Sequence, residues 1–297
     1  MKKLLIVLSA AFVCCALQAQ TKKTQIVCGV TDPYYPTNYK VDDIFIFDSL
    51  IEKITGDKDI DTKNYSELIP AIGKYFIGTP YVAHTLECEK EVLTINLREL
   101  DCTTFLENVV VISTLVKKSE ANFETYLQRI AQFRYRKGEV DGYASRIHYF
   151  SDWIVTNEKR GFVKNITKKI GGEPYAKTIN FMTQNREKYP RLKDEKTFEE
   201  IKKSEDNLNK HKHYYIPKSK VAEIEKNIHS GDLIAITCTT EGLDIAHVGL
   251  AVEKNGRIHF MHAPMSGEKV MISAEPLHDY LAKRKGNTGI MVARMIY

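Results

Sequence analysis

Apolar positions recur at helical spacing in several stretches of this 297-residue chain. Three long amphipathic helices are predicted, at 41–55, 65–76 and 121–137, because their apolar residues fall on one side of a 3.6-residue period. Apolar and polar residues instead alternate from 91 to 97, which is the period of a strand. The first half of the chain is therefore predicted to be mainly helical.

From Ser230 onward the pattern changes to short apolar stretches separated by turn residues, which predicts an antiparallel meander. Asn255-Gly256 stands between two of these stretches and favours a two-residue type I′ hairpin turn. Such a turn fixes the register, because each residue before it then has one definite partner after it. In this register Gly249 lies opposite His262.

The predicted register brings two histidines together. Side chains alternate between the faces of a strand, so His247 shares a face with Gly249 and His262. His259 points to the other face. We therefore expect His262, and not His259, to orient the imidazole of His247, although a slip by one residue would reverse this choice.

A cysteine stands at the start of another apolar run, from Leu100 to about Val116. Asp101 is a good N-cap residue, so Cys102 is predicted to lie in the first turn of a helix. The positive end of the helix dipole favours a thiolate there. A small buried core residue is the alternative interpretation for a lone cysteine.

Several short motifs occur together with this cysteine and the two histidines, and in this order the chain resembles the NlpC/P60 superfamily of papain-like cell-wall amidases and peptidases. The motifs are Gly78-Thr79-Pro80-Tyr81, Asp101-Cys102, Gly231-Asp232-Leu233, His247-Val248-Gly249 and His262-Ala263-Pro264.

The resemblance implies an α+β, papain-like NlpC/P60 fold in which the nucleophile helix packs on an antiparallel sheet. It implies Cys102 as nucleophile, His247 as base and His262 as the residue that orients the base. Tyr81 would be a second oxyanion donor, and Asp101 belongs to the same substrate-facing set. Neither a cofactor nor a metal is expected.

The chain departs from the plain family pattern in having Val-Ala-His after Tyr81 and a long separation between the cysteine helix and Gly231. These features resemble the DUF1460 branch, which is associated with N-acetylmuramoyl-L-alanine amidase activity on muropeptides. One catalytic domain is expected over 20–297, with its core at about 65–120 and 225–297 and an insertion at about 121–224.

Within the insertion, polar groups gather around large aromatic side chains, as a sugar-binding wall requires. The residues are Arg146, His148, Tyr149, Asp152 and Trp153. An ordinary helix packed on the core would use the same residues, with Trp153 as its anchor. The insertion also contains a strand-like stretch at 178–182 and a charged helix at about 194–210.

The beginning of the chain has the composition of a secretory signal peptide, here residues 1–19. A basic start precedes an apolar run that is too short to span a bilayer, so an exported, periplasmic protein without a transmembrane segment is expected. A lipid anchor at Cys14 or Cys15 is disfavoured, because neither cysteine follows a small residue.

Four cysteines remain after such processing, and Cys28 with Cys88 is the disulfide pair to test. The formal net charge of +5 is modest for this length, which gives no argument for nucleic-acid binding. Muropeptides from peptidoglycan are the expected partners.

The sequence leaves three alternatives to consider. A zinc site at His259 and His262 is disfavoured, because residues three apart on a strand face opposite sides. An endopeptidase that cuts γ-D-glutamyl–diamino-acid bonds would keep the cysteine chemistry and change the bond. A wall-binding protein without activity would retain the fold alone.

Overall fold

The computed structural model describes residues 36–57, 59–60 and 63–296. The predicted signal peptide at 1–19 and the proposed disulfide partner Cys28 lie outside the described residues. Within the described residues, no helix is both long enough and apolar enough to cross a membrane.

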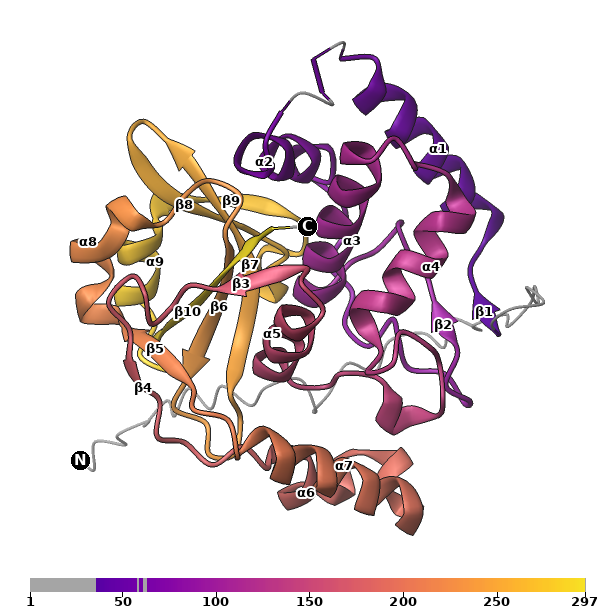
Figure 1. Ribbon diagram of the computed structural model, residues 1–297, viewed down its shortest axis with the longest axis vertical. Coiled ribbons are helices and arrows are strands. Elements are labelled where there is room, and N and C mark those ends of the chain that lie inside the picture. Colours follow the sequence, from indigo (N-terminus) through magenta and orange to yellow (C-terminus); the bar gives the residue numbers. More distant parts are fainter. Residues whose placement is uncertain (1–35, 58, 61–62, 297) are drawn as a thin grey trace, which may run out of the picture.

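The fold is mixed α/β and is built around an antiparallel sheet. Among the described residues this sheet has eight strands in the order β4-β5-β10-β6-β7-β8-β9, with β3 pairing with β10 (Figure 1). Its strands are β3 (Val163–Asn165), β4 (Glu173–Pro174), β5 (Tyr214–Pro217), β6 (Leu233–Cys238), β7 (Ile245–Lys254), β8 (Arg257–His262), β9 (Met271–Pro276) and β10 (Asn287–Met295).

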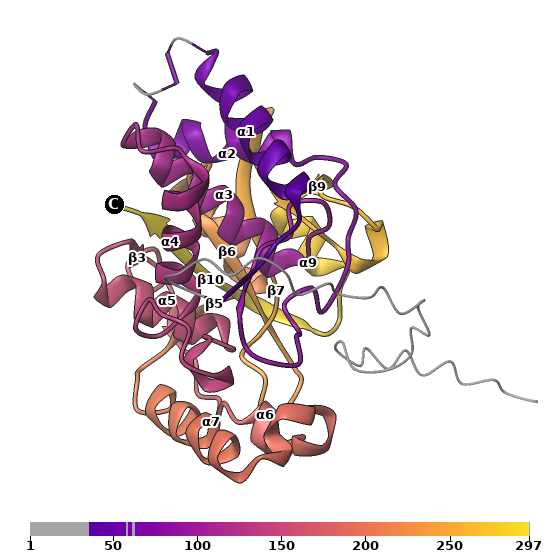
Figure 2. The same ribbon diagram turned by 90° about the vertical axis from the view of Figure 1, so that its right-hand side faces the viewer.

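Helices cover both faces of the sheet, as Figures 1 and 2 show. The larger group packs on one face, and α8 and α9 lie on the other side. The helices are α1 (Val41–Thr55), α2 (Tyr65–Tyr75), α3 (Cys102–Lys117), α4 (Phe123–Arg134), α5 (Phe150–Lys159), α6 (Phe181–Gln184), α7 (Glu195–Leu208), α8 (Val221–Ile224) and α9 (Leu277–Ala282).

Alternation along the central strands produces two hydrophobic cores. Ala235 and Val248 face the core that contains α3, whereas Ile236 and Phe260 face the core beneath α9. Because successive strand residues point to opposite faces, β6 and β7 contribute to both cores; β6 is buried throughout, and β7 is buried from Val248 to Val252. The sheet is thus held between two helical layers.

The predicted hairpin register is confirmed. Asn255 and Gly256 both have positive φ, as a type I′ turn requires, and Lys254 pairs with Arg257 across it. Further along, Leu250 pairs with Met261, so the pairing continues without a slip towards the histidines.

The cysteine helix begins at Cys102, as predicted, but it is not amphipathic. Every residue from Thr104 to Val116 is buried. Inside this helix, Glu107 forms an ion pair of 2.8 Å with Arg134 of α4 and accepts a hydrogen bond of 3.1 Å from Trp153 Nε1 of α5. α3 is therefore a central element of this helical layer, in contact with α2, α4 and α5.

Two predicted strands were wrong in extent or type. Of the stretch 91–97, only β2 (Leu93–Thr94) is paired, in parallel with β1 (Thr37–Asn38). The stretch 178–182 runs into α6, because the Gly242 carbonyl accepts hydrogen bonds from the backbone of Asn180 and Phe181. Bonds to a loop therefore replace the pairing that a strand would need.

Candidate active site

Cys102 is the first residue of α3, and its neighbour Asp101 caps the helix. The Asp101 carboxylate accepts a hydrogen bond of 2.8 Å from the Thr104 backbone N–H, and the Thr104 hydroxyl accepts one of 2.9 Å from the Asp101 N–H. This capping box fixes where the helix begins. The Cys102 side chain is only partly buried, at the positive end of a sixteen-residue helix.

The segment 78–82, here called the strap, connects this helix start to the turn between β8 and β9. Tyr81 donates its backbone N–H to Glu268 at 2.7 Å, while Leu100 donates to Pro80 at 2.9 Å. Gly78 supplies the positive φ of 92° with which the strap leaves the preceding helix. The Gly-Thr-Pro-Tyr motif therefore places Tyr81 beside the residues that precede Cys102.

The Gly231-Asp232-Leu233 motif acts elsewhere, at the start of the sheet. A Cβ at Gly231 would lie 2.7 Å from the Tyr65 carbonyl oxygen, and φ there is +84°. The buried Asp232 carboxylate binds Arg294 at 2.6 Å and caps the preceding turn through His229. This motif fixes the start of β6.

The two predicted imidazoles are in direct contact. His247 Nε2 and His262 Nδ1 are 2.7 Å apart, with the rings nearly perpendicular at 78°. Phe260 stacks on His262 at 4.5 Å and meets the edge of His247 at 5.6 Å. His259 faces away and bonds the Ser273 carbonyl, so the prediction that His262 is the partner is confirmed.

Burial keeps both imidazoles neutral. It lowers the pKa of His247 to about 4, with a smaller contribution from the positive charge of Arg284. Burial lowers the pKa of His262 further, to about 2, and the charges of His247 and Arg284 act in the same direction. At neutral pH, His247 is therefore able to accept a proton.

Two residues of this site carried no motif and were missed by the sequence analysis. The Tyr280 ring of α9 lies edge-on to His262 at 5.2 Å, and the Arg284 guanidinium lies 3.5 Å above the Tyr280 ring. Burial raises the pKa of Tyr280 to about 12, and the negative charge of a Cys102 thiolate adds to this effect. Tyr280 therefore lies beside His262 and within electrostatic range of Cys102.

The chain matches a known family of cell-wall amidases. Residues 71–290 match the family described as AmiA-like, N-acetylmuramoyl-L-alanine amidase-like. The chain belongs to this amidase-like family. No curated protein matches the chain.

Solved structures support the assignment to the amidase-like family. An N-acetylmuramoyl-L-alanine amidase from Bacteroides uniformis ATCC 8492 is 34% identical, with a TM-score of 0.74 over 78% of this chain and 99% of that one. A Bacteroides fragilis protein provisionally named a xylanase is also 34% identical, with a TM-score of 0.69 over 75% and 99%. A Legionella pneumophila DUF1460 protein shares the fold at 20% identity, with a TM-score of 0.65 over 86% and 94%.

The predicted sugar wall needs correction, because this amidase-like chain uses its residues inside the protein. Trp153 is 1% exposed and stacks on Phe150 at 5.0 Å. Tyr149 is 4% exposed and donates its hydroxyl to Glu205 at 2.6 Å. An aromatic ring without an exposed face cannot stack on a sugar.

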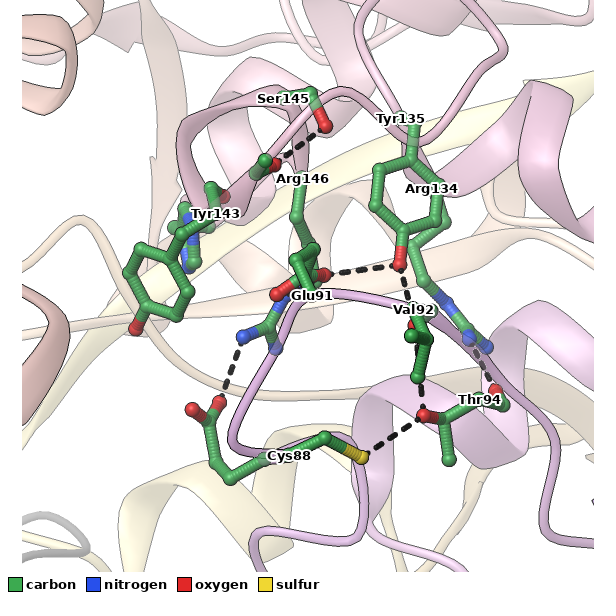
Figure 3. A network of polar contacts seen from close by, with 12 residues as sticks. Cys88, Glu91, Val92, Thr94, Arg134, Tyr135, Tyr143, Ser145 and Arg146 are labelled. Carbon is green, nitrogen blue, oxygen red and sulfur yellow. Dashed lines mark hydrogen bonds and ion pairs between the residues drawn. The ribbon is translucent and has the colours of Figure 1, made fainter. Parts of the chain in front are cut away.

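The polar residues of the predicted sugar wall also bind other residues of the protein. Arg146 forms ion pairs with Glu87 at 2.7 Å and Glu91 at 3.0 Å, beside the Tyr143 ring (Figure 3). His148 bonds the Tyr143 carbonyl at 2.9 Å, and burial holds its pKa well below the usual value. The Arg146 ion pairs join the insertion to the loop before β2, and the His148 bond lies within the insertion, so both side chains are engaged inside the protein.

The remaining described cysteines have other surroundings. Cys88 forms no disulfide with a described residue and lies 3.4 Å from the Thr94 hydroxyl; its proposed partner Cys28 lies outside the described residues. Cys238 is buried at the end of β6, where burial raises the pKa of its thiol. Cys102, which lies at a helix start with a partly exposed side chain, is the best placed of the three described cysteines to react.

Proposed function

We propose that this chain is a cysteine N-acetylmuramoyl-L-alanine amidase with a papain-like, NlpC/P60-type site. Membership of the amidase-like family supports the reaction class. The observation that supports the mechanism is the pair of imidazoles, 2.7 Å apart on the sheet, together with the cysteine at the capped start of α3. A capped cysteine at a helix start and a base held by a second polar group form the usual constellation of a thiol hydrolase.

The positions of the protons on the two imidazoles define the roles of His247 and His262. When His247 donates its Nε2–H to His262 Nδ1, its own Nδ1 carries the lone pair. That nitrogen takes the proton of the Cys102 thiol in the proposed first step. His262 fixes the tautomer and orientation of His247.

The thiolate then attacks the amide carbon that joins the muramyl lactyl group to L-alanine. The Cys102 backbone N–H and Tyr81 stabilise the oxyanion, each donor being worth about 3 kcal/mol. When the C–N bond breaks, the His247 imidazolium gives its proton to the leaving amine, and a thioester remains. His247 next activates a water that hydrolyses the thioester and returns the proton to the thiolate.

The proposal also places this reaction in the periplasm. A signal peptide at 1–19 is the basis for placing the enzyme in the periplasm, where released muropeptides would reach it. The centre consists of a thiol and two imidazoles, whereas glycoside hydrolysis normally uses a pair of carboxylates. A xylanase activity is therefore not proposed.

Mass spectrometry of a defined digest tests the function. Purified protein is incubated with a disaccharide-tetrapeptide, beside Cys102→Ala and, as a matched control, Cys238→Ala. Release of intact tetrapeptide and disaccharide, lost only in Cys102→Ala, is the expected result. Fragments cut within the peptide would make the chain an endopeptidase, and turnover that survives Cys102→Ala would refute the cysteine mechanism.

A further inference from the structure

Arg284 has an unusual position next to the imidazole pair. Its guanidinium lies over the Tyr280 ring, and that ring also contacts His262. Among the described residues, only its Nη1 has a hydrogen-bond acceptor, the Tyr280 carbonyl at 2.9 Å. The side chain is 35% exposed, so Nε and Nη2 are available to a ligand that enters from solvent.

The surroundings of Arg284 are predominantly cationic. Lys283 and Lys285 flank it in the sequence, and Lys218 donates to its carbonyl oxygen at 3.2 Å. Glu275 of β9 is the nearest described carboxylate, 3.9 Å from Nη1, and it binds Lys283 more closely at 3.4 Å. Because Lys283 and Arg284 share the single carboxylate of Glu275, the surroundings of Arg284 have a net positive charge.

A positive charge at this place opposes the proposed chemistry. His247 must hold a proton between the attack and the departure of the amine, and the field of Arg284 disfavours the protonated forms of both His247 and His262. The conflict disappears if an anionic group neutralises Arg284 when substrate binds. The same anion would then make the imidazolium easier to form.

We propose that Arg284 is a specificity-determining residue that binds a carboxylate of the substrate's peptide. This inference rests on the proposed amidase function. A planar guanidinium held on an aromatic ring presents two parallel donors to a carboxylate. On the leaving side of the scissile amide, L-alanine has no free carboxylate, so the first available one is the α-carboxylate of the second residue, D-glutamate.

Two muramyl dipeptides that differ in this single group test the proposal. N-acetylmuramoyl-L-Ala-D-Glu carries the carboxylate, and N-acetylmuramoyl-L-Ala-D-isoglutamine carries a neutral amide in its place. We expect the wild-type protein to prefer the acid by about 10- to 100-fold in kcat/KM, the range of one charge-assisted pair. Arg284→Gln should lose this preference by slowing the acid only, and Arg284→Lys should keep part of it.

Arg257→Gln is the matched control, because Arg257 is an exposed arginine that pairs with Glu225 at 2.8 Å beside the β7–β8 turn. This variant should retain the full preference for the acid. A wild-type protein with equal kcat/KM for both dipeptides would overturn the proposal. So would an Arg284→Gln variant that slows both dipeptides equally, since that is the result of a purely structural role.

Binding separates this proposal from the amidase function itself. The affinities of both dipeptides are measured by calorimetry with Cys102→Ala and with Cys102→Ala/Arg284→Gln. Tighter binding of the acid that disappears with Arg284 supports the carboxylate site even where wild type cleaves neither compound, and in that case only the amidase assignment fails. Equal affinities for acid and amide would refute the carboxylate site whatever bond is cut.

Discussion

The position after His247-Val248 lacks room for a side chain. Replacement of Gly249 by alanine should therefore separate the imidazoles of His247 and His262. A Cβ at this position would lie 2.5 Å from the Met261 carbonyl oxygen and 2.9 Å from the His262 Cβ. Since φ at Gly249 is not in the left-handed region, the cost of Gly249→Ala is steric. The methyl group would push directly on the strand that carries His262.

The size of the effect follows from these distances. Ordinary Cβ contacts begin at 3.4 Å, so the neighbours must retreat by about 0.5 to 0.9 Å. Overpacking of this kind costs about 1–3 kcal/mol of stability. The same shift would stretch the 2.7 Å contact between His247 and His262 beyond good hydrogen-bond geometry, and a misplacement of about 1 Å lowers rates by about 100-fold.

Urea unfolding and kcat/KM on the disaccharide-tetrapeptide measure the two effects separately. Gly286→Ala is the matched control, because nothing lies within 4 Å of its Cβ position and its backbone is not in the left-handed region. This control should keep both stability and activity. Full activity in Gly249→Ala, together with the expected loss of stability, would refute the link between the His247–His262 contact and catalysis.

Four further outcomes are expected. Glu107→Gln should lower the free energy of unfolding by about 3–5 kcal/mol in urea titrations. Glu107 and Arg134 are both nearly inaccessible to solvent, and Arg134 would be left without its counter-ion. A change below about 1 kcal/mol would contradict this. His262→Asn should retain more activity than His262→Ala, because an amide can still accept the His247 Nε2–H; equal losses would show that His262 does not orient His247. On acidification, kcat/KM should persist until the pH falls through about 4, the lowered pKa of His247, and a decline near 6.5 would contradict this. Stability should be complete above about 6.5 and decrease below it, because the unfolded histidines bind protons that the folded ones resist.

Local rules predicted the parts of this fold that depend on neighbouring residues. The helix expected at 41–55 has these bounds in the structure, and Asn255-Gly256 set the hairpin register that joins His247 to His262. Capping chemistry likewise located the start of the helix at Cys102. In each case the deciding contacts lie within a few residues of one another, or directly across a two-residue turn.

Tertiary contacts decided the features that the sequence analysis missed. The aromatic residues around Trp153 have the same pattern whether a helix faces solvent or packs inside, and only the partner Glu107 in α3 shows that Trp153 is internal. The stretch 178–182 alternates like a strand, but the nearest backbone donors and acceptors belong to the loop at Gly242. Periodicity in a short segment cannot distinguish these outcomes.

Arg284 shows a further limit, which has a functional consequence. Tyr280 and Arg284 are four residues apart at the end of a short helix, and this spacing allows the guanidinium to cover the ring. The spacing does not indicate which other residues the ring contacts. In the proposed mechanism, the motifs around Cys102, His247 and His262 would determine which bond chemistry is possible, because thiol and imidazole must be placed closely for acyl transfer. A charge on a separate element can vary without disturbing that geometry. Selection among anionic and neutral substrates would therefore reside in α9 and the loop that follows it, where no motif records it.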